Sequence, residues 1–455
     1  MTMRQDYADN RIVVVGAGST GLALCRYFHQ RGARVVLSDA RRREEIAGLA
    51  TLPEAVLLDC GRHSTPEFLA ADLVVLSPGV PDTIPAVAAA RQAGIAVLGE
   101  VEIAWRELTA PLIAITGTNG KSTTTSLIGA MFQAWGRQTF VGGNLGLPLI
   151  EATARQDWDW VVAELSSFQL ETIAAFRPRY ALLLNITEDH LDRYPDMAAY
   201  VAAKARIFEN QQPQDVAILN ADDPLVSAMA PQIPARIVWF SSSRLLEEGM
   251  GYDGSHIRWS RQGLQASFPV AELRLRGLHN VENVMAALIP ALLEGCPAEL
   301  AWEAACTFAG LDHRMVAVRQ LDGVWYYNDS KGTNVGSVVK SLAGLEAPVT
   351  LIAGGKDKGG DYGPLADLVR SKVAHLILIG QAAPLIAAAL GQLTDTRCAG
   401  SLPEAVQLAR QLTPSGGAVL LSPGCSSFDM FGSYIERGEV FTQAVLALPE
   451  KEGCR

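Results

Sequence analysis

Short apolar runs bounded by glycine or polar turns recur along the whole chain. Such runs indicate buried strands, and apolar residues at helical spacing, as in residues 127–135, indicate helices between them. Strands that alternate with helices predict parallel, doubly wound α/β sheets. The predicted strands span residues 11–15, 35–37, 56–58, 73–76, 96–98, 113–115, 160–163, 181–184, 217–219, 324–327, 349–352, 376–379 and 418–421.

One segment departs from this alternation and helps to divide the chain. Residues 237–275 show a period of two with Gly and Asp turns, which predicts a small antiparallel patch. A chain of 455 residues is long enough for three domains of roughly 150 residues each. We therefore expect domains at residues 1–99, 100–310 and 311–455, with the first boundary at Gly99 and Glu100.

Composition narrows the class of protein. The chain is 49% hydrophobic and 19% charged, which is typical of a globular fold. Its net charge of −10 and lack of a basic tract argue against a nucleic-acid partner. Seven cysteines without a C-x-x-C pair indicate reduced thiols and give no zinc signature. The N-terminus lacks a signal-peptide core, and no apolar run approaches the ~18 residues of a membrane span, so we expect a cytoplasmic protein.

A glycine turn in the second predicted domain carries the clearest chemistry. An apolar strand leads into Thr116–Thr123, and a helix follows directly. This arrangement wraps backbone N–H groups around phosphate oxygens. Lys121 would reach the terminal phosphates, and the hydroxyl of Ser122 or Thr123 would bind Mg²⁺. The spacing G-x-x-x-x-G-K-[ST] puts Ile115 at its first glycine, so the match is partial and an ordinary glycine turn is the alternative.

A second glycine turn lies near the N-terminus. Gly16–Gly21 reads G-x-G-x-x-G between two predicted strands, and Asp39 follows the second strand. Alone, this predicts a dinucleotide site and a nicotinamide-dependent oxidoreductase, although Asp39 could also be a turn residue. That hypothesis leaves Thr116–Thr123 unexplained. A binding protein with a decayed site is a third hypothesis, which the intact Gly120-Lys121-Ser122 argues against.

Three further polar residues, two at or after the ends of predicted strands and one on a predicted helix, each have two interpretations. Glu164 ends a strand and is either a metal ligand or a solvated carboxylate at the sheet edge. His190 lies between two acids and is either a ligand or a structural histidine. Lys204 lies on a predicted helix and, from its surroundings in the sequence alone, is more typical of a solvated lysine.

Taken together, the motifs resemble a known family. Thr116–Thr123 resembles the ATP loop of the Mur ligases and the related folylpolyglutamate synthetases. Four more stretches resemble the glutamate-adding members of the Mur ligases, and the resemblance covers nearly the whole chain: residues 164–171, 185–194, 328–334 and 422–431. It implies a Rossmann-like N-terminal domain, a central P-loop-type ATPase domain and a Rossmann-like C-terminal domain.

The resemblance also implies a reaction. ATP would phosphorylate the carboxylate of UDP-N-acetylmuramoyl-L-alanine, and the amine of D-glutamate would attack the acyl phosphate to give an amide, ADP and phosphate. Two Mg²⁺ ions would help the carboxylate approach the polyphosphate, since anions repel. The partners would be these small molecules, the D configuration rests on the resemblance, and the enzyme would be a monomer. The third domain would swing onto the second to complete the site.

The resemblance assigns roles to individual residues. The catalytic residues would be Lys121, His190 and Lys204, with Lys204 carbamylated. The metal ligands would be Ser122, Glu164, His190 and Lys204. ATP would be bound by Gly117, Thr118, Asn119, Gly120, Lys121, Ser122, Thr123, Asn280, Asn283, Arg314 and Asp329. The UDP-sugar would be bound by Ser19, Thr20, Asp39, Arg41, Ser77, Gly79 and Asn144. The incoming amino acid would be bound by Lys331, Thr333, Lys358, Ser427, Phe428 and Tyr434. Ala40, Gly332, Lys356 and Tyr434 depart from residues common in the family.

Overall fold

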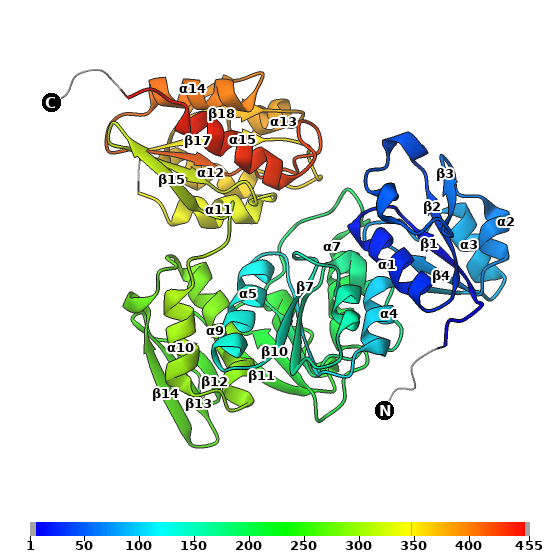
Figure 1. Cartoon of the computed structure of the whole chain (residues 1–455). Coiled ribbons are helices and arrows are strands. Elements are labelled where there is room, and N and C mark those ends of the chain that lie inside the picture. The colour runs from blue at the N-terminus through cyan, green and yellow to red at the C-terminus, as the bar shows by residue number, and fades with distance from the viewer. Residues whose placement is uncertain (1–5, 347, 451–455) are drawn as a thin grey trace. The chain divides into compact units, whose positions relative to one another are not determined.

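The computed structural model of the chain describes residues 6–346 and 348–450 (Figure 1). The chain divides into two compact units. The first unit comprises the residues up to 185 together with 201–272 and 282–306. The second unit comprises residues 186–200, 273–281 and the chain from 307 onwards. The first unit contains two β-sheets and the second contains one.

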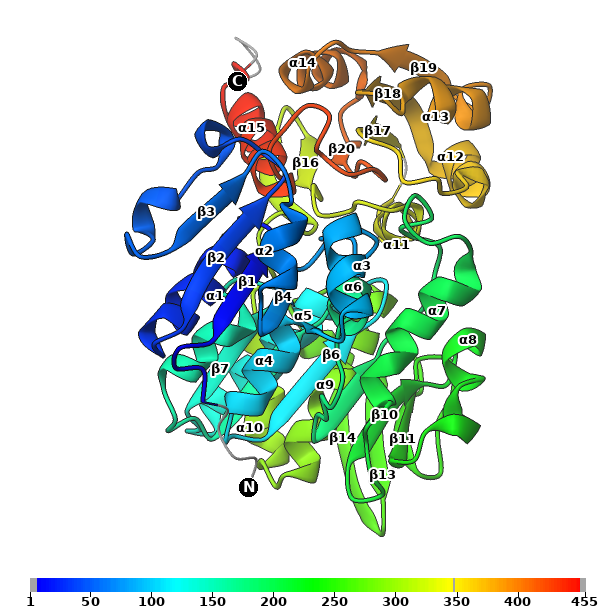
Figure 2. The ribbon, with the colours of Figure 1, turned by 90° about the vertical axis from the view of Figure 1, so that its right-hand side faces the viewer.

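The N-terminal sheet has five parallel strands in the order β3-β2-β1-β4-β5. Figure 2 shows β2, β1 and β4 side by side. Apolar side chains of α2 and α3 pack on one face of the sheet, around Phe68 and Val87. The elements are β1 (Arg11–Val15), α1 (Ser19–Gln30), β2 (Arg34–Asp39), β3 (Leu57–Cys60), α2 (Thr65–Leu69), β4 (Leu73–Leu76), α3 (Pro85–Gln92) and β5 (Ala96–Gly99). All five predicted strands are present.

The central sheet has nine strands in the order β14-β13-β12-β11-β10-β9-β6-β8-β7. Its strands are β6 (Leu112–Thr116), β7 (Thr139–Gly143), β8 (Trp160–Glu164), β9 (Tyr180–Leu183), β10 (Val216–Asn220), β11 (Arg236–Ser241), β12 (Gly249–Tyr252), β13 (His256–Arg261) and β14 (Leu264–Pro269). Its helices are α4 (Glu100–Glu107), α5 (Lys121–Ala134), α6 (Ser167–Leu170), α7 (Met197–Ala205), α8 (Pro224–Ser227), α9 (Leu278–Leu293) and α10 (Ala298–Thr307).

The antiparallel patch predicted for residues 237–275 is smaller than expected. Only β12, β13 and β14 pair antiparallel, whereas β11 pairs parallel with both β10 and β12. The reason is that β11 is an inner strand that packs Val238 and Phe240 in the core, so it continues the parallel part of the sheet.

The third sheet has six strands in the order β15-β16-β20-β17-β18-β19, and only β15 and β16 pair antiparallel. Apolar side chains of α14 and α15 cover one face, and those of α11, α12 and α13 cover the other, which is the doubly wound arrangement that the pattern predicted. The elements are β15 (Val316–Leu321), β16 (Val324–Asn328), α11 (Val335–Ala343), β17 (Val349–Gly354), α12 (Ala366–Lys372), β18 (Val373–Ile379), α13 (Ala383–Leu390), β19 (Asp395–Cys398), α14 (Leu402–Leu412), β20 (Ala418–Leu421) and α15 (Tyr434–Leu446).

Within the described residues, no helix combines the length and the apolar character needed to cross a membrane.

Candidate active site

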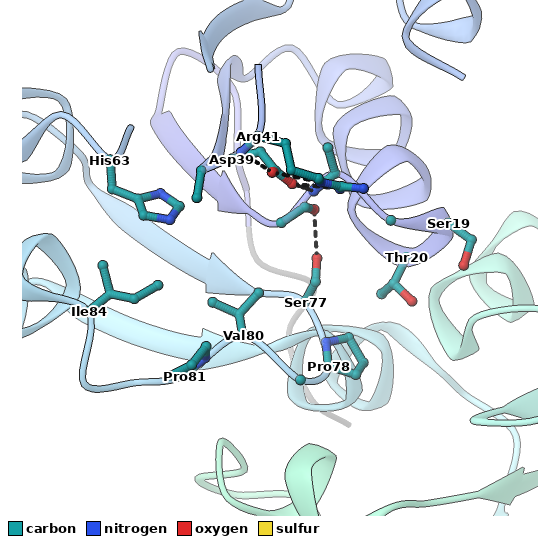
Figure 3. Close-up of a pocket in the computed structure, with 15 residues that line it drawn as sticks. Ser19, Thr20, Asp39, Arg41, His63, Ser77, Pro78, Val80, Pro81 and Ile84 are labelled. Atoms are coloured by element: carbon teal, nitrogen blue, oxygen red, sulfur yellow. Dashed lines mark hydrogen bonds and ion pairs between the residues drawn. The ribbon is translucent and has the colours of Figure 1, made fainter. Parts of the chain in front are cut away.

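A cavity of about 480 Å³ lies at the carboxyl ends of the strands of the N-terminal sheet (Figure 3). The glycine turn after β1 forms one side of it. A side chain at Gly21 would collide with the carbonyl oxygen of Gly16, so α1 packs closely against the turn. Ser77, which follows β4, donates a 3.0 Å hydrogen bond to the same carbonyl oxygen. The lining residues are Gly16, Ala17, Gly18, Ser19, Thr20, Asp39, Ala40, Arg41, His63, Ser77, Pro78, Gly79, Val80, Pro81 and Ile84.

The cavity brings together six of the seven residues predicted to bind a UDP-sugar: Ser19, Thr20, Asp39, Arg41, Ser77 and Gly79. Asn144 does not line it. The side chain of Asn144 instead donates to Glu164 at the end of β8, at 2.8 Å. The cavity also contains His63, which the sequence did not single out because a lone histidine in a polar loop carries no motif.

The carboxylate of Asp39 is fully engaged within the protein. It accepts hydrogen bonds from the backbone N–H of Ala17 at 2.7 Å and from three N–H groups of Arg41. Burial acts to raise the pKa of Asp39, but the hydrogen bonds from Arg41 and Ala17 outweigh it and lower the pKa to about 2. Asp39 therefore fixes the glycine turn. The oxidoreductase hypothesis would need this carboxylate to accept ribose hydroxyls instead.

The second glycine turn lies between β6 and α5. Gly117 and Gly120 have φ values of 148° and 88°, which favour glycine. A side chain at Gly120 would collide with the amide oxygen of Asn283. Asn185, directly after β9, holds the turn: its amide accepts from the N–H of Asn119 at 2.8 Å and donates to the carbonyl of Asn119 at 3.0 Å. Asn185 lies in a stretch that carried the resemblance, but the sequence assigned it no role.

Two lysines converge on this turn. The ammonium of Lys121 donates to the carbonyl oxygens of Gly117 and Thr118, each at 2.9 Å. The ammonium of Lys204 donates to the Gly117 carbonyl oxygen at 2.8 Å. Lys204 is only 2% exposed, so the interpretation as a solvated helix lysine is wrong. The reason is that α7 presents this residue to the glycine turn rather than to water.

Hydroxyl groups and a carboxylate lie buried at the same edge of the central sheet. Ser122 and Thr123 lie in the first turn of α5 and are both buried. The hydroxyl of Thr123 has no hydrogen-bond partner among the described residues, so it is available to an oxygen-rich ligand or its cation. Glu164 ends β8, an inner strand between β6 and β7, and is 2% exposed. The interpretation of Glu164 as a solvated carboxylate is therefore wrong.

The remaining residues predicted to bind ATP or metal fall in both units. Asn283 of α9 accepts from the hydroxyl of Thr124 at 3.4 Å in the first unit. His190, Asn280, Arg314 and Asp329 belong to the second unit. Asp329 follows β16 and accepts from Ser341 and Ser422, each at 2.7 Å, and its burial raises its pKa. Across residues 6–346 and 348–450, no three His, Cys, Asp or Glu side chains form a ready-made metal site.

The residues predicted to bind the incoming amino acid divide into separate groups. Thr333 and Lys358 line a narrow cavity of about 20 Å³ in the second unit, together with Asp189. Lys331 donates to the hydroxyl of Tyr434 at 3.4 Å. Ser427 is buried, whereas Phe428 is 71% exposed.

Lys358 does not offer an isolated charge. Its ammonium forms an ion pair with Asp189 at 3.0 Å, and Asn334 donates to the other oxygen of the same carboxylate at 2.9 Å. Burial acts to raise the pKa of Asp189, but the charges of Lys358 and His190 outweigh it and hold the pKa below its usual range. Asp189 thus positions Lys358 beside Thr333.

A buried arginine that the sequence did not single out joins two loops of the second unit. Arg437 of α15 is 1% exposed. It donates to the hydroxyl and carbonyl of Ser330 at 3.0 and 2.8 Å, and to the carbonyls of Cys425 and Ser426 at 3.2 Å. The loops after β16 and β20 are therefore held by one guanidinium. An arginine within an amphipathic helix gives no local signal of such a role.

Comparisons with known proteins match the three sheets in order. Residues 10–99 match the family model described as Mur ligase MurD-like, N-terminal domain. Residues 115–291 match the Mur ligase middle domain, and residues 313–425 match the Mur ligase, glutamate ligase domain.

Individual proteins agree with these models. A UDP-N-acetylmuramoylalanine--D-glutamate ligase of Syntrophotalea carbinolica is 64% identical over 97% of this chain and 99% of its own length. A second ligase of the same name, from Geotalea uraniireducens, is 53% identical over 98% of this chain and 99% of its own length. The solved UDP-N-acetylmuramate-alanine ligase MurC of Thermotoga maritima aligns with a TM-score of 0.61 at 20% identity, over 96% of this chain and 99% of that one.

Proposed function

The chain belongs to the Mur ligase family, and on that premise we propose that it is an ATP-dependent amide ligase that joins D-glutamate to UDP-N-acetylmuramoyl-L-alanine in peptidoglycan precursor synthesis. The observation that carries this function is the 64% identity, over 97% of this chain, with a ligase of that name. The three α/β parts carry polar loops at strand ends, which would supply the sites that such a reaction needs.

The reaction requires an activated carboxylate, because a carboxylate does not form an amide directly with an amine. ATP supplies the activation by phosphorylating the alanyl carboxylate, and the amine of glutamate then displaces phosphate. In our proposal the turn from Gly117 to Thr123 holds the phosphates, with Lys121 directed at the transferred group. The support is the collision that any side chain at Gly120 would cause and the unpartnered hydroxyl of Thr123.

We propose that a magnesium site forms at this turn. Ser122 and Glu164 would supply hard oxygen ligands, and His190 would add an imidazole. Bound Mg²⁺ would neutralise phosphate charge so that the two anions can approach. We propose that two ions bind.

We further propose that Lys204 carries a carbamate. The ammonium groups of Lys204 and Lys121 donate to one carbonyl oxygen, that of Gly117, so two like charges lie close together, one of them buried and the other partly buried. Addition of CO₂ to the unprotonated amine forms a bond from Nζ to carbon and releases a proton, which replaces one of these cations with an oxygen ligand. A ¹³CO₂-dependent carbamate signal in the NMR spectrum of the wild-type protein, lost in Lys204→Arg, would support the proposal. A wild-type spectrum without the signal would contradict it.

Binding of the other two substrates follows from the remaining sites. The UDP-sugar would occupy the cavity of the N-terminal sheet, with its diphosphate at the glycine turn and α1. Asn144 would act near Glu164 rather than inside that cavity. Glutamate would be bound in the second unit by the groups around Lys331, Thr333, Lys358, Ser427, Phe428 and Tyr434. Asn280, Arg314 and Asp329 would serve the nucleotide. We also propose that the enzyme is a cytoplasmic monomer with domain boundaries near residues 99 and 310, and that the third domain closes onto the second.

Release of ADP from ATP tests the function. The purified protein is expected to release ADP only when UDP-N-acetylmuramoyl-L-alanine and D-glutamate are both present, and to form the amide in equal amount. L-Glutamate and D-alanine serve as matched controls for the configuration and for the second carboxylate. Equal product from L- and D-glutamate would contradict the assigned substrate.

A further inference from the structure

His63 occupies one side of the cavity in the N-terminal sheet, opposite the end that suits phosphate. It lies in the loop between β3 and α2, and its ring packs edge-on against Phe68 with centroids 6.1 Å apart. In Figure 3 the imidazole points into the cavity from the side of Ile84, whereas Ser19 of α1 lies on the other side. The helix N-terminus thus suits the diphosphate, and the His63 side remains for the base.

A chain of hydrogen bonds fixes which ring nitrogen of His63 carries the proton. The hydroxyl of Ser38 donates to Asp59 at 2.9 Å, because a carboxylate only accepts. Ser64 donates to the same carboxylate through its N–H and its hydroxyl, and these hydrogen bonds outweigh burial and keep the pKa of Asp59 below its usual value. The single proton of the Ser38 hydroxyl is therefore used.

In the 2.9 Å contact between the Ser38 hydroxyl and Nδ1 of His63, the Ser38 oxygen must then be the acceptor. Nδ1 carries the proton and donates, which leaves Nε2 of the neutral ring as an acceptor. No hydrogen bond of Nε2 is found within the described part of the chain. Other polar groups nearby are less available, because Asp39 is saturated by Ala17 and Arg41 and Ala40 presents only a methyl group.

We propose that Nε2 of His63 accepts a hydrogen bond from N3–H of uracil and so selects a uridine nucleotide. This rests on the proposed function and extends it to a specificity residue. Uracil carries one ring N–H donor at the edge that a protein reads, whereas cytosine carries a lone pair at the same position. An acceptor with a fixed tautomer therefore attracts uracil and repels cytosine. Val80, Pro81 and Ile84 add apolar surface for a planar base.

The test is calorimetric binding of UDP, 3-methyl-UDP and CDP, which requires no turnover. His63→Ala and His63→Leu are expected to weaken UDP binding about 5- to 30-fold, the effect of leaving one donor unpaired. His63→Gln keeps an oxygen acceptor and is expected to retain affinity within a few-fold. With 3-methyl-UDP the wild type and His63→Ala are expected to bind equally weakly, because the donor is gone. His375→Ala, outside the cavity, is the matched control.

Two further readouts separate this role from a merely structural one. Ser38→Ala is expected to weaken UDP binding in the wild type and to have no added effect in His63→Ala, because Ser38 acts through the ring. In turnover, His63→Ala is expected to raise KM for the UDP-sugar and to leave KM for ATP and glutamate unchanged.

An equal loss for UDP and 3-methyl-UDP, or no loss at all, would overturn the proposal. If the wild type binds neither UDP nor the UDP-sugar, the assignment of the cavity is itself wrong. If His63→Ala binds the UDP-sugar as tightly as the wild type does, the role of His63 is contradicted and the assignment of the cavity stands.

Discussion

At the scale of single residues, two lysines that we propose to act on ATP both donate to the carbonyl oxygen of Gly117. Lys121 and Lys204, far apart in sequence, donate to it at 2.9 and 2.8 Å. Both ammonium groups are therefore positioned before any phosphate arrives. A transferred phosphoryl group would take over the Lys121 donor without a large rearrangement, which is how a fixed charge stabilises a transition state, whereas Lys204 would by then carry its carbamate.

Lys121→Ala is expected to lower kcat about 10²- to 10³-fold, because charge on the transferred phosphoryl group would lose its cation. Steady-state kinetics with all three substrates measures this, and KM for the UDP-sugar should stay near the wild-type value. Arg155→Ala, which removes an exposed cation paired with Asp157, is the control and should leave kcat unchanged. Turnover of Lys121→Ala within a few-fold of wild type would contradict the assigned role.

The ion pair between Asp189 and Lys358 is best tested by comparing a single variant with a double variant. Lys358→Ala alone leaves a buried carboxylate without its cation, so it should cost about 3–5 kcal/mol of folding stability. Asp189→Asn/Lys358→Met removes both charges and should recover most of that stability in denaturant melts. If Lys358 also binds glutamate, the double variant should still raise KM for glutamate about 10- to 150-fold. A double variant with normal KM for glutamate would restrict Lys358 to a structural role.

Single residues also mark the limit of what the sequence predicts. The glycines of both turns were predictable, because strand, turn and helix are consecutive in the chain. Lys204 was not predictable from its neighbours, because its burial depends on where α7 packs. His63 and Asp39 likewise depend on partners brought together by the sheet.

At the scale of elements, α15 controls two loops through Arg437. Burial lowers the pKa of Arg437 to about 10, and its hydrogen-bond partners among the described residues are hydroxyl and carbonyl oxygens rather than carboxylates. Its planar fork therefore serves as a geometric clamp between the loops after β16 and β20. Those loops carry Lys331 and Ser427.

Arg437→Lys is expected to keep the charge but lose the fork, and to raise KM for glutamate about 10-fold or more while KM for the UDP-sugar stays constant. Steady-state kinetics with each substrate varied in turn measures the KM for glutamate and the KM for the UDP-sugar separately. Arg397→Lys, at an exposed site in the same unit, is the control. Equal increases in all three KM values would contradict a role of Arg437 confined to the loops that carry Lys331 and Ser427, whereas a lower apparent kcat alone would report only a loss of folded enzyme.

The first residue of α4 makes the stability of the protein depend on pH. Glu100 is buried and accepts from the N–H of Ile150 at 2.6 Å, and burial raises its pKa from 4.5 to about 7. Between these pH values the folded state holds a proton that the unfolded state has lost. The free energy of unfolding should therefore fall as pH rises from about 4.5 to 7.

Glu100→Gln mimics the protonated acid and should remove this slope. Its stability is expected to match wild type near pH 5 and to exceed it by roughly 2–4 kcal/mol near pH 8. Denaturant unfolding at a series of pH values measures the difference, with the exposed Glu54→Gln as control. A difference between wild type and Glu100→Gln that stays constant with pH would refute the role of Glu100.

At the scale of the whole molecule, each of the three sheets has candidate site residues in loops that follow parallel strands. Parallel strands put polar loops at their carboxyl ends. In the first sheet this gives the cavity around Asp39, in the second the turn after β6, and in the third the loops after β16 and β20. The sequence predicted this much because buried parallel strands are continuous apolar runs.

Three strands at the sheet edges, β7, β15 and β19, escaped prediction, the last two for the opposite reason. β15, β19 and β7 each pair with one neighbour only, and β15 and β19 carry exposed polar residues that break the apolar run. Contacts between loops from different strands, such as those of Arg437, were also beyond the sequence, since no local pattern records them.

The transfer of oxygen from carboxylate to phosphate tests the central claim most directly. UDP-N-acetylmuramoyl-L-alanine labelled with ¹⁸O in its carboxylate is incubated with the enzyme, ATP and D-glutamate, and the inorganic phosphate is examined by mass spectrometry. Activation through an acyl phosphate predicts that each turnover moves one ¹⁸O atom from the carboxylate into inorganic phosphate, so that one labelled phosphate forms for each amide. Amide formation with unlabelled phosphate would contradict the account.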